Sequence, residues 1–178
     1  MKKKANKRSR LVLVLGGASS GKSQAALELA GRSGPKAFVA TGEALDGEMA
    51  DRIKRHRATR SAEWVTAEVP RELAAWFRSE GKAYRTIVVD CLTLWLSNLC
   101  GRRITDKDIT EPVDDLLQAI RAVPARVVLV SNELGFGLVP ANRSARAFRD
   151  LAGGVNQQVA DAADEVYVVI SGQSLKLK

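Results

Sequence analysis

The fold is decided by the stretch "LVLVLGGASSGKSQAALELA", which runs from Leu11 to Ala30. It contains the complete phosphate-loop pattern, Gly16-x-x-x-x-Gly21-Lys22-Ser23, between an apolar run and an alanine-rich helical segment. Glycines permit backbone angles that turn successive amide N–H groups toward one centre, and the positive end of the following helix strengthens that anion site. In this pattern the lysine reaches the β- and γ-phosphates and the serine hydroxyl binds Mg²⁺. The sequence therefore predicts a nucleoside triphosphate site formed by residues 16–23.

Two carboxylates follow apolar runs and are candidates to hold the metal. Asp90 ends "TIVVD", and Glu133 comes just after "VVLVSN". Ligands of open α/β sheets bind at the carboxyl ends of strands, where a phosphate loop commonly has an acidic partner on a neighbouring strand. Asp90 is the preferred metal ligand, with helix capping as the alternative. Glu133 is either a second functional carboxylate or a structural one.

Short apolar runs alternate with helical patterns along the chain. Runs rich in Val, Ile and Leu predict strands at 10–15, 36–40, 85–90, 126–131 and 165–171. Helical patterns occupy 22–31, 46–57, 70–79, 92–99, 112–122 and 142–162, and Pro112 is expected to be a first helical residue. The tail at 174–178 is a candidate edge strand. This alternation predicts an α/β fold, a mostly parallel sheet with helices on both faces.

The charge of the chain is concentrated at its start. The net charge is +8, but six of the 28 basic residues precede residue 11, which leaves 22 against 20 acidic residues. We therefore expect residues 1–10 to be a disordered basic leader and residues 11–178 to form one domain, with no nucleic-acid partner. No apolar run approaches the roughly 18 residues of a membrane span. The apolar run after the basic start is also too short for a secretory signal, so we expect a cytoplasmic protein without stable membrane insertion.

A second candidate site lies in "LDGEMADRIKRHRATR", residues 45–60. Met49, Ile53 and His56 fall on one stripe of a predicted amphipathic helix, with arginines beside and after it. A neutral imidazole can attack phosphorus, and guanidinium groups can stabilise the transition state. A packed or solvated histidine is the alternative. The chain has one histidine and two cysteines, too few for the usual Cys/His metal clusters, and Cys91 and Cys100 are expected to be buried thiols.

From about Leu11 to Lys178 the chain closely resembles the bifunctional adenosylcobinamide kinase/adenosylcobinamide-phosphate guanylyltransferase family. The resemblance rests on several blocks in order. They are "GGASSGKS", "VATGEALDGEMADRIKRHRATR", "WVTAE", "VSNELGFGLVP", "NRSARAFRDLAGGVNQQVADAADEVYVVISG" and "LKLK". The phosphate loop alone is generic, whereas the later blocks in this order are specific to the family.

The resemblance implies two linked reactions. Adenosylcobinamide is phosphorylated by ATP or GTP, and GMP is then transferred from GTP to the new phosphate, giving adenosylcobinamide-GDP and pyrophosphate. In the family GMP is first carried on a histidine, which here matches His56. Lys22 is implied as a second catalytic residue, and Ser23 and Asp90 as Mg²⁺ ligands. The implied nucleotide-binding residues are Gly16, Gly17, Ala18, Ser19, Ser20, Gly21, Lys22 and Ser23; Ala40, Thr41 and Gly42; Arg57, Ala58, Thr59 and Arg60; Glu68; and Asp90.

The family further implies a RecA-like phosphate-loop fold and a homotrimer. The basic leader, Thr41-Gly42 and Ala58-Thr59 depart from common family choices, which leaves nucleotide preference open. The loop 133–142, with two glycines and a proline, is either a flap over the corrinoid or a plain connection. Arg143, Arg146 and Arg149 recur at spacing three and either meet a substrate phosphate or form a solvated helix face. A plain phosphate-loop kinase and a nucleic-acid-stimulated NTPase are the rival functions.

Overall fold

The computed structural model describes residues 9–31, 34–43, 47, 51, 54, 61–101 and 107–178. Its strands form one seven-stranded sheet in the order β3-β2-β4-β5-β1-β6-β7. All neighbouring strands are parallel except the last pair, β6 and β7, which is antiparallel. The strands are β1 (Arg10–Gly16), β2 (Lys36–Ala40), β3 (Trp64–Glu68), β4 (Thr86–Asp90), β5 (Arg126–Asn132), β6 (Glu165–Ile170) and β7 (Gln173–Lys176).

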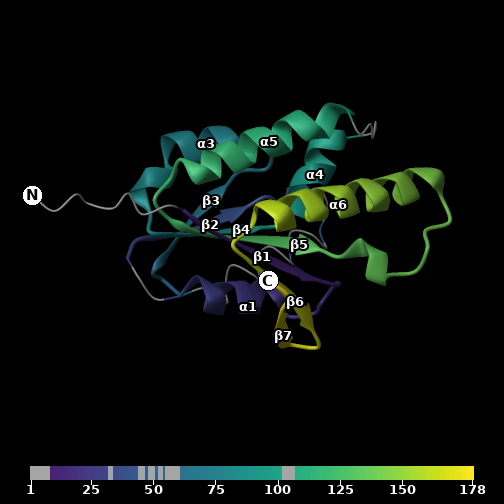
Figure 1. Cartoon of the computed structure of the whole chain (residues 1–178), viewed down its shortest axis with the longest axis horizontal. Coiled ribbons are helices and arrows are strands. Elements are labelled where there is room, and N and C mark those ends of the chain that lie inside the picture. The colour runs from purple at the N-terminus through teal and green to yellow at the C-terminus, as the bar shows by residue number, and fades with distance from the viewer. Residues whose placement is uncertain are drawn as a thin grey trace, which may run out of the picture.

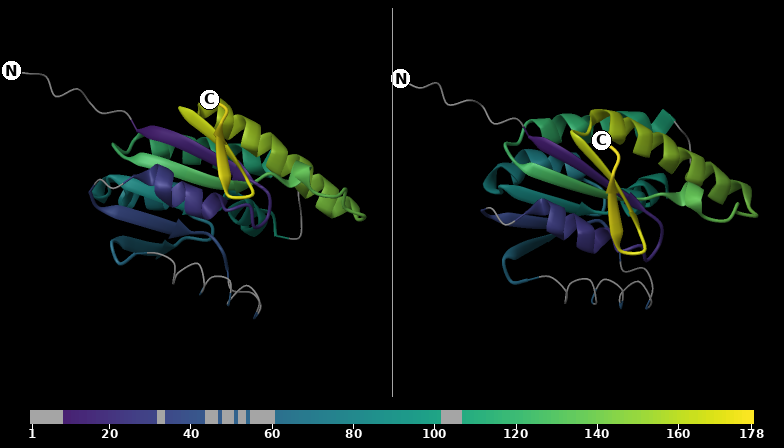
Figure 2. Two further views of the ribbon diagram at one scale, coloured as in Figure 1. Left: turned by 90° about the horizontal axis from the view of Figure 1, so that it is seen from below. Right: turned by 60° about the horizontal axis from the view of Figure 1, so that its bottom comes forward.

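Helices cover both faces of the sheet, as predicted (Figure 1). One face is covered by α1 (Lys22–Ala30), and the other by α3 (Leu73–Ser79), α4 (Leu92–Cys100), α5 (Lys107–Arg121) and α6 (Arg143–Ala162). The views in Figure 2 show α1 apart from the other four helices. The described residues also form two 3₁₀ turns, η1 (Gly81–Ala83) and η2 (Leu134–Phe136). Among the described residues no helix is both long and apolar enough to cross a bilayer.

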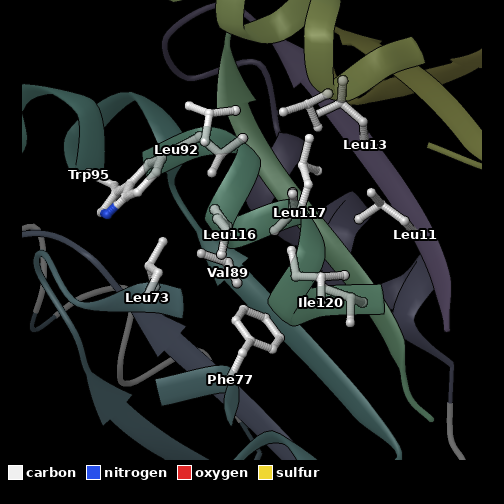
Figure 3. Close-up of a cluster of buried hydrophobic side chains, with 14 of the residues drawn as sticks. Leu11, Leu13, Leu73, Phe77, Val89, Leu92, Trp95, Leu116, Leu117 and Ile120 are labelled. Atoms are coloured by element: carbon white, nitrogen blue, oxygen red, sulfur yellow. The ribbon is translucent and has the colours of Figure 1, made fainter. Parts of the chain in front are cut away.

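The larger core lies between the sheet and its four-helix face. Leu11, Leu13 and Val89 project from strands toward apolar side chains of the helices (Figure 3). Those helical side chains include Leu73, Phe77, Leu92, Trp95, Leu116, Leu117 and Ile120. The inner strands are apolar on both faces because each face is covered, which removes the polar alternation of a one-sided sheet. The core therefore holds the carboxyl ends of β1, β4 and β5 in a fixed register.

Two sequence expectations need correction. Trp64–Glu68, expected to be outside the strands, forms β3; it is a half-exposed edge strand and lacks the continuous apolar run of the inner strands. Helix α5 begins at Lys107, and Pro112 lies inside it, because Ile109, one turn before the proline, is already buried in the core. Arg10 belongs to β1, as the strand predicted at 10–15 indicated, and its amide donates to Ala125 O. The helix expected at 46–57 lies outside the described residues except for Gly47, Asp51 and Lys54, which are helical.

Candidate nucleotide-binding site

The phosphate loop connects the carboxyl end of β1 to the first turn of α1. Gly21, immediately before the helix, has φ +92°, a left-handed conformation that favours glycine. The side chain of Lys22 is buried, and its Nζ donates to Gly17 O at 2.8 Å, which folds the ammonium group back into the loop. Ala18 and Ser19 are exposed at the tip, while Ser23 is half-buried in the first helical turn. This arrangement places backbone amides, a lysine and a hydroxyl around one helix N-terminus, as an anion site requires.

The C-terminal hairpin packs against the phosphate loop. The sequence did not indicate this contact. The amide of Gly172, in the turn between β6 and β7, donates to Ser20 O at 2.8 Å. A Cβ on Gly21 would lie 3.2 Å from the Cα of Gly172, and a Cβ on Gly16 would lie 2.7 Å from Val169 O. Close packing therefore also restricts the residues at positions 16 and 21.

The sheet register brings several predicted site residues to one edge. Ala40, the last residue of β2, pairs with Glu68 of β3 on one side and with Asp90 of β4 on the other. Gly16, the last residue of β1, pairs with Asn132 of β5. Because these strands are parallel, all these positions lie at their carboxyl ends, where ligands bind in open α/β sheets. Glu68 is exposed and Asp90 is half-buried at this edge.

Glu133, and not Asp90, follows the strand next to the phosphate-loop strand. Strand β5 lies between β4 and β1, and the amide of Glu133 donates to Gly16 O at 3.0 Å. Its carboxylate accepts from the Gly135 amide at 3.1 Å and from Asn156 Nδ2 at 3.4 Å. The carboxylate is therefore positioned by a turn and by a buried side chain of α6.

Asp90 nevertheless lies close to the phosphate loop. Burial raises the pKa of the neighbouring Cys91 thiol to about 12; the charge of Asp90 adds to the rise, and the charge of Lys22 opposes it. Since such effects decline with distance, the ammonium group and the carboxylate both lie near this thiol. Cys91 is buried and Cys100 is half-buried. Burial thus favours the protonated form of the Cys91 thiol.

Thr41, predicted to contact the nucleotide at a strand end, has a buried side chain. Its side chain is 0% exposed, and its hydroxyl bonds both the amide and the carbonyl of Cys91. Ala40 and Gly42, on either side, are half-buried. The residues His56, Arg57, Ala58, Thr59 and Arg60 lie outside the described part of the chain.

The connection from β5 to α6 combines an anchored base with exposed apolar side chains. Asn142 caps α6 by accepting from the Ala145 amide, and the Arg146 guanidinium donates to the carbonyls of Pro140 and Ala141. In contrast, three apolar side chains, from the last residue of η2 to the residue before Pro140, stand largely in solvent. They are Phe136 at 67%, Leu138 at 95% and Val139 at 71% exposure.

The arginine series at the start of α6 is mostly engaged locally. Arg146 bonds the preceding loop, and Arg149 pairs with Asp150 at 3.1 Å. These contacts favour a structural role for both residues over contact with a substrate phosphate.

The donor set at the edge suits magnesium. Among the described residues no group of three or more His, Cys, Asp or Glu side chains is placed to bind a metal. The donors include hard oxygens, such as the Ser23 hydroxyl and the Asp90 carboxylate, and Mg²⁺ is commonly held by one or two such groups together with substrate phosphates.

The fold is shared with solved structures. The flagellar accessory protein FlaH from Methanocaldococcus jannaschii is similar with a TM-score of 0.57 at 13% identity, covering 97% of this chain and 79% of that one. The KaiC-like protein PH0186 from Pyrococcus horikoshii is similar with a TM-score of 0.51 at 14% identity, covering 90% of this chain and 71% of that one. The P4 protein of bacteriophage phi6, solved in complex with ADP, is similar with a TM-score of 0.50 at 19% identity, covering 93% of this chain and 52% of that one. The fold and the loop define a RecA-like phosphate-loop protein.

Sequence comparison identifies the family. Residues 12–177 match the family described as cobinamide kinase / cobinamide phosphate guanyltransferase, and the chain belongs to it. The bifunctional adenosylcobalamin biosynthesis protein CobP of Pseudomonas aeruginosa is 44% identical over 169 residues, which cover 93% of this chain and 96% of the relative. The bifunctional adenosylcobalamin biosynthesis proteins CobU of Salmonella typhimurium and CobU of Escherichia coli are each 41% identical over 180 residues. These residues cover 94% of this chain and 99% of each relative. The activities of the chain are those of the family, cobinamide kinase and cobinamide phosphate guanyltransferase.

Proposed function

We propose that this protein phosphorylates adenosylcobinamide with ATP or GTP and then transfers GMP from GTP to the product, in adenosylcobalamin biosynthesis. The observation that carries the proposal is the phosphate loop with Lys22 folded into it, at a sheet edge that also presents Asp90 and Glu133. Generic phosphate-loop proteins share the loop, so the choice of substrates rests on family membership.

In the kinase step, the substrate hydroxyl attacks the γ-phosphorus and the nucleoside diphosphate leaves. Lys22 and the loop amides neutralise charge on the β- and γ-phosphates, which positions the transferred group. The backbone amide of Glu133 donates a hydrogen bond to Gly16 O, so Glu133 lies directly beside the loop. This position supports a role in orienting the substrate hydroxyl. Asp90, one strand further, is assigned with Ser23 to the metal. We infer that Mg²⁺, when bound, neutralises charge that develops on the phosphate oxygens.

In the guanylyl transfer, the neutral imidazole of His56 attacks the α-phosphorus of GTP. A phosphorus–nitrogen bond forms, the bond to the β-phosphate oxygen breaks, and pyrophosphate leaves. The phosphate of adenosylcobinamide phosphate then displaces the imidazole and takes the GMP. The support for His56 is the family resemblance and the fact that the chain has no second histidine. Arg57, Ala58, Thr59, Arg60 and Glu68 are proposed to contact the guanine nucleotide.

The loop 133–142 is proposed to face the corrinoid. The large exposed apolar side chains at 136, 138 and 139 belong to the same connection as Glu133, which supports contact between this loop and a substrate whose hydroxyl meets Glu133. An exposed apolar patch beside a polar site is typical of a binding surface for an amphipathic ligand. We further propose, from the family alone, a cytoplasmic homotrimer.

The test is incubation of the purified protein with adenosylcobinamide, GTP and Mg²⁺, with products identified by mass. Adenosylcobinamide phosphate and adenosylcobinamide-GDP are expected from the wild type. His56→Ala should form only the phosphate, and Lys22→Ala should form neither product. Labelled GTP should leave an acid-labile adduct on wild type that His56→Ala lacks.

The rival functions give different results in the same experiment. Kinase product without any histidine adduct in the wild type would favour a plain phosphate-loop kinase. Salt-sensitive DNA binding that stimulates NTP hydrolysis and is lost on deletion of residues 2–8, without corrinoid turnover, would favour a nucleic-acid-dependent NTPase. The deletion stops before Ser9 because Arg10 belongs to β1. Glu133→Gln should slow phosphorylation while the histidine adduct still forms; the opposite result would contradict the role given to Glu133.

A further inference from the structure

Thr41 hydrogen-bonds the backbone at the end of β4 through both its side chain and its amide. Its hydroxyl accepts from the Cys91 amide at 2.8 Å and donates to Cys91 O at 2.7 Å. Its own amide donates to Asp90 O at 3.2 Å. A threonine hydroxyl has one donor and two acceptor sites, so both side-chain bonds are satisfied together. Since the side chain is 0% exposed, water cannot replace the Thr41 hydroxyl as the partner of these backbone groups.

We propose that Thr41 is a positioning residue for the Asp90 carboxylate. The peptide group between Asp90 and Cys91 is held at both its polar atoms by Thr41, the carbonyl by the amide and the N–H by the hydroxyl. On its other side Asp90 belongs to β4, where it pairs with Ala40 and with Val130. The Cα of Asp90 thus lies between a sheet ladder and this clamp, which together set the direction of its side chain.

The clamp is itself held in place by α4. Asn98 Nδ2 donates to Thr41 O at 2.8 Å and to Pro70 O at 2.9 Å. The chain leaving β2 is therefore joined to α4 as well as to the end of β4. A ligand at this edge meets a carboxylate whose backbone cannot shift without breaking bonds that are buried from solvent. Groups that orient metal ligands in this way act without touching the metal.

The inference rests on the proposed function, in which Asp90 binds the metal of the nucleotide. Four variants separate the two ideas. Thr41→Val has the shape of threonine without its hydroxyl, and Thr41→Ser keeps the hydroxyl. Thr86→Val is the matched control, because Thr86 is also buried but begins β4 at the opposite end of the strand. Asp90→Asn tests the role of the carboxylate itself.

The measurement is Mn²⁺ binding to each protein with a non-hydrolysable GTP analogue, followed by electron paramagnetic resonance. Thr41→Val is expected to weaken binding by about tenfold, the lower end of what partners of metal ligands contribute. Thr41→Ser and Thr86→Val should bind as the wild type does. Thermal unfolding without metal should show similar losses for the two valine variants. The Mg²⁺ concentration for half-maximal kinase rate should rise in Thr41→Val alone of the threonine variants.

The outcomes are distinguishable. Wild-type affinity in Asp90→Asn would overturn the proposed role of Asp90, and the inference with it. Weakened binding in Asp90→Asn together with wild-type affinity in Thr41→Val would overturn the inference alone. Equal weakening in Thr41→Ser and Thr41→Val would also overturn it, since the hydroxyl would not be the cause. If Thr41→Val does not fold, Thr41→Cys, with its weaker hydrogen-bonding thiol, must bind Mn²⁺ less tightly than Thr41→Ser, and equality refutes the clamp.

Discussion

Replacing Gly16 by alanine tests the close packing around the phosphate loop. An added Cβ would lie 2.5 Å from Ser20 Oγ and 2.7 Å from Val169 O. The serine hydroxyl can rotate away, but Val169 is paired with Gly16 in the ladder between β1 and β6, so its carbonyl is fixed. The adjacent Gly17 is the matched control, because a Cβ there would meet no atom of the described residues within 4 Å.

The cost follows from this difference. Overpacking of a well-packed site costs about 1–3 kcal/mol, and the fixed carbonyl places Gly16→Ala near the upper end. For a chain of this size a loss of about 3 kcal/mol lowers Tm by about 6–12 °C. Gly17→Ala meets no such obstacle and should stay within about 0.5 kcal/mol of the wild type.

Urea unfolding followed by tryptophan fluorescence and circular dichroism measures both variants. Equal stability of Gly16→Ala and Gly17→Ala would refute the packing argument. Ser20→Ala in the Gly16→Ala background provides a second check. It removes only the movable obstacle and should recover less than half of the loss. Full recovery would show that the carbonyl of Val169 is not the barrier.

Three further predictions concern Glu165, Trp95 and Cys91. Burial favours neutral Glu165, but the hydrogen bond from Tyr167 and the charge of Arg126 outweigh it and hold its pKa below the usual range. The charged form therefore stabilises the fold above the ordinary pKa, and this stabilisation is lost as pH falls through the lowered pKa. Glu165→Gln should lower the free energy of unfolding, measured in urea, by about 2 kcal/mol near neutral pH and by much less in acid. Trp95→Ala, at a core position 2% exposed, should cost about 3–5 kcal/mol by the same assay, and a loss below 1 kcal/mol would contradict its place in the core. The buried thiol of Cys91 should resist iodoacetamide in the native protein at mildly alkaline pH and react only after unfolding, as peptide mapping would show; labelling of native Cys91 would contradict its burial.

Local patterns were sufficient for the parts of the fold with strong local signals. The inner strands were predictable because they are buried on both faces and therefore consist of continuous apolar residues. The edge strand β3 was missed because a half-exposed strand keeps polar residues and lacks that signal. The start of α5 was misplaced because Pro112 is a local signal, whereas the burial of Ile109 is a tertiary one.

The sequence by itself determined the phosphate loop, since its glycines, lysine and serine act through backbone geometry and chemistry that need only a strand before and a helix after them. The roles of His56 and of the residues that follow it rest on the family resemblance and stay a prediction. Only the tertiary structure decided the order of the strands, which places Glu133 beside the loop and Asp90 one strand further away. It also decided that the Thr41 hydroxyl bonds the backbone and that Gly172 supports Ser20. These contacts join residues far apart in the chain, and their geometry depends on sheet register and helix packing, which no short stretch of sequence encodes.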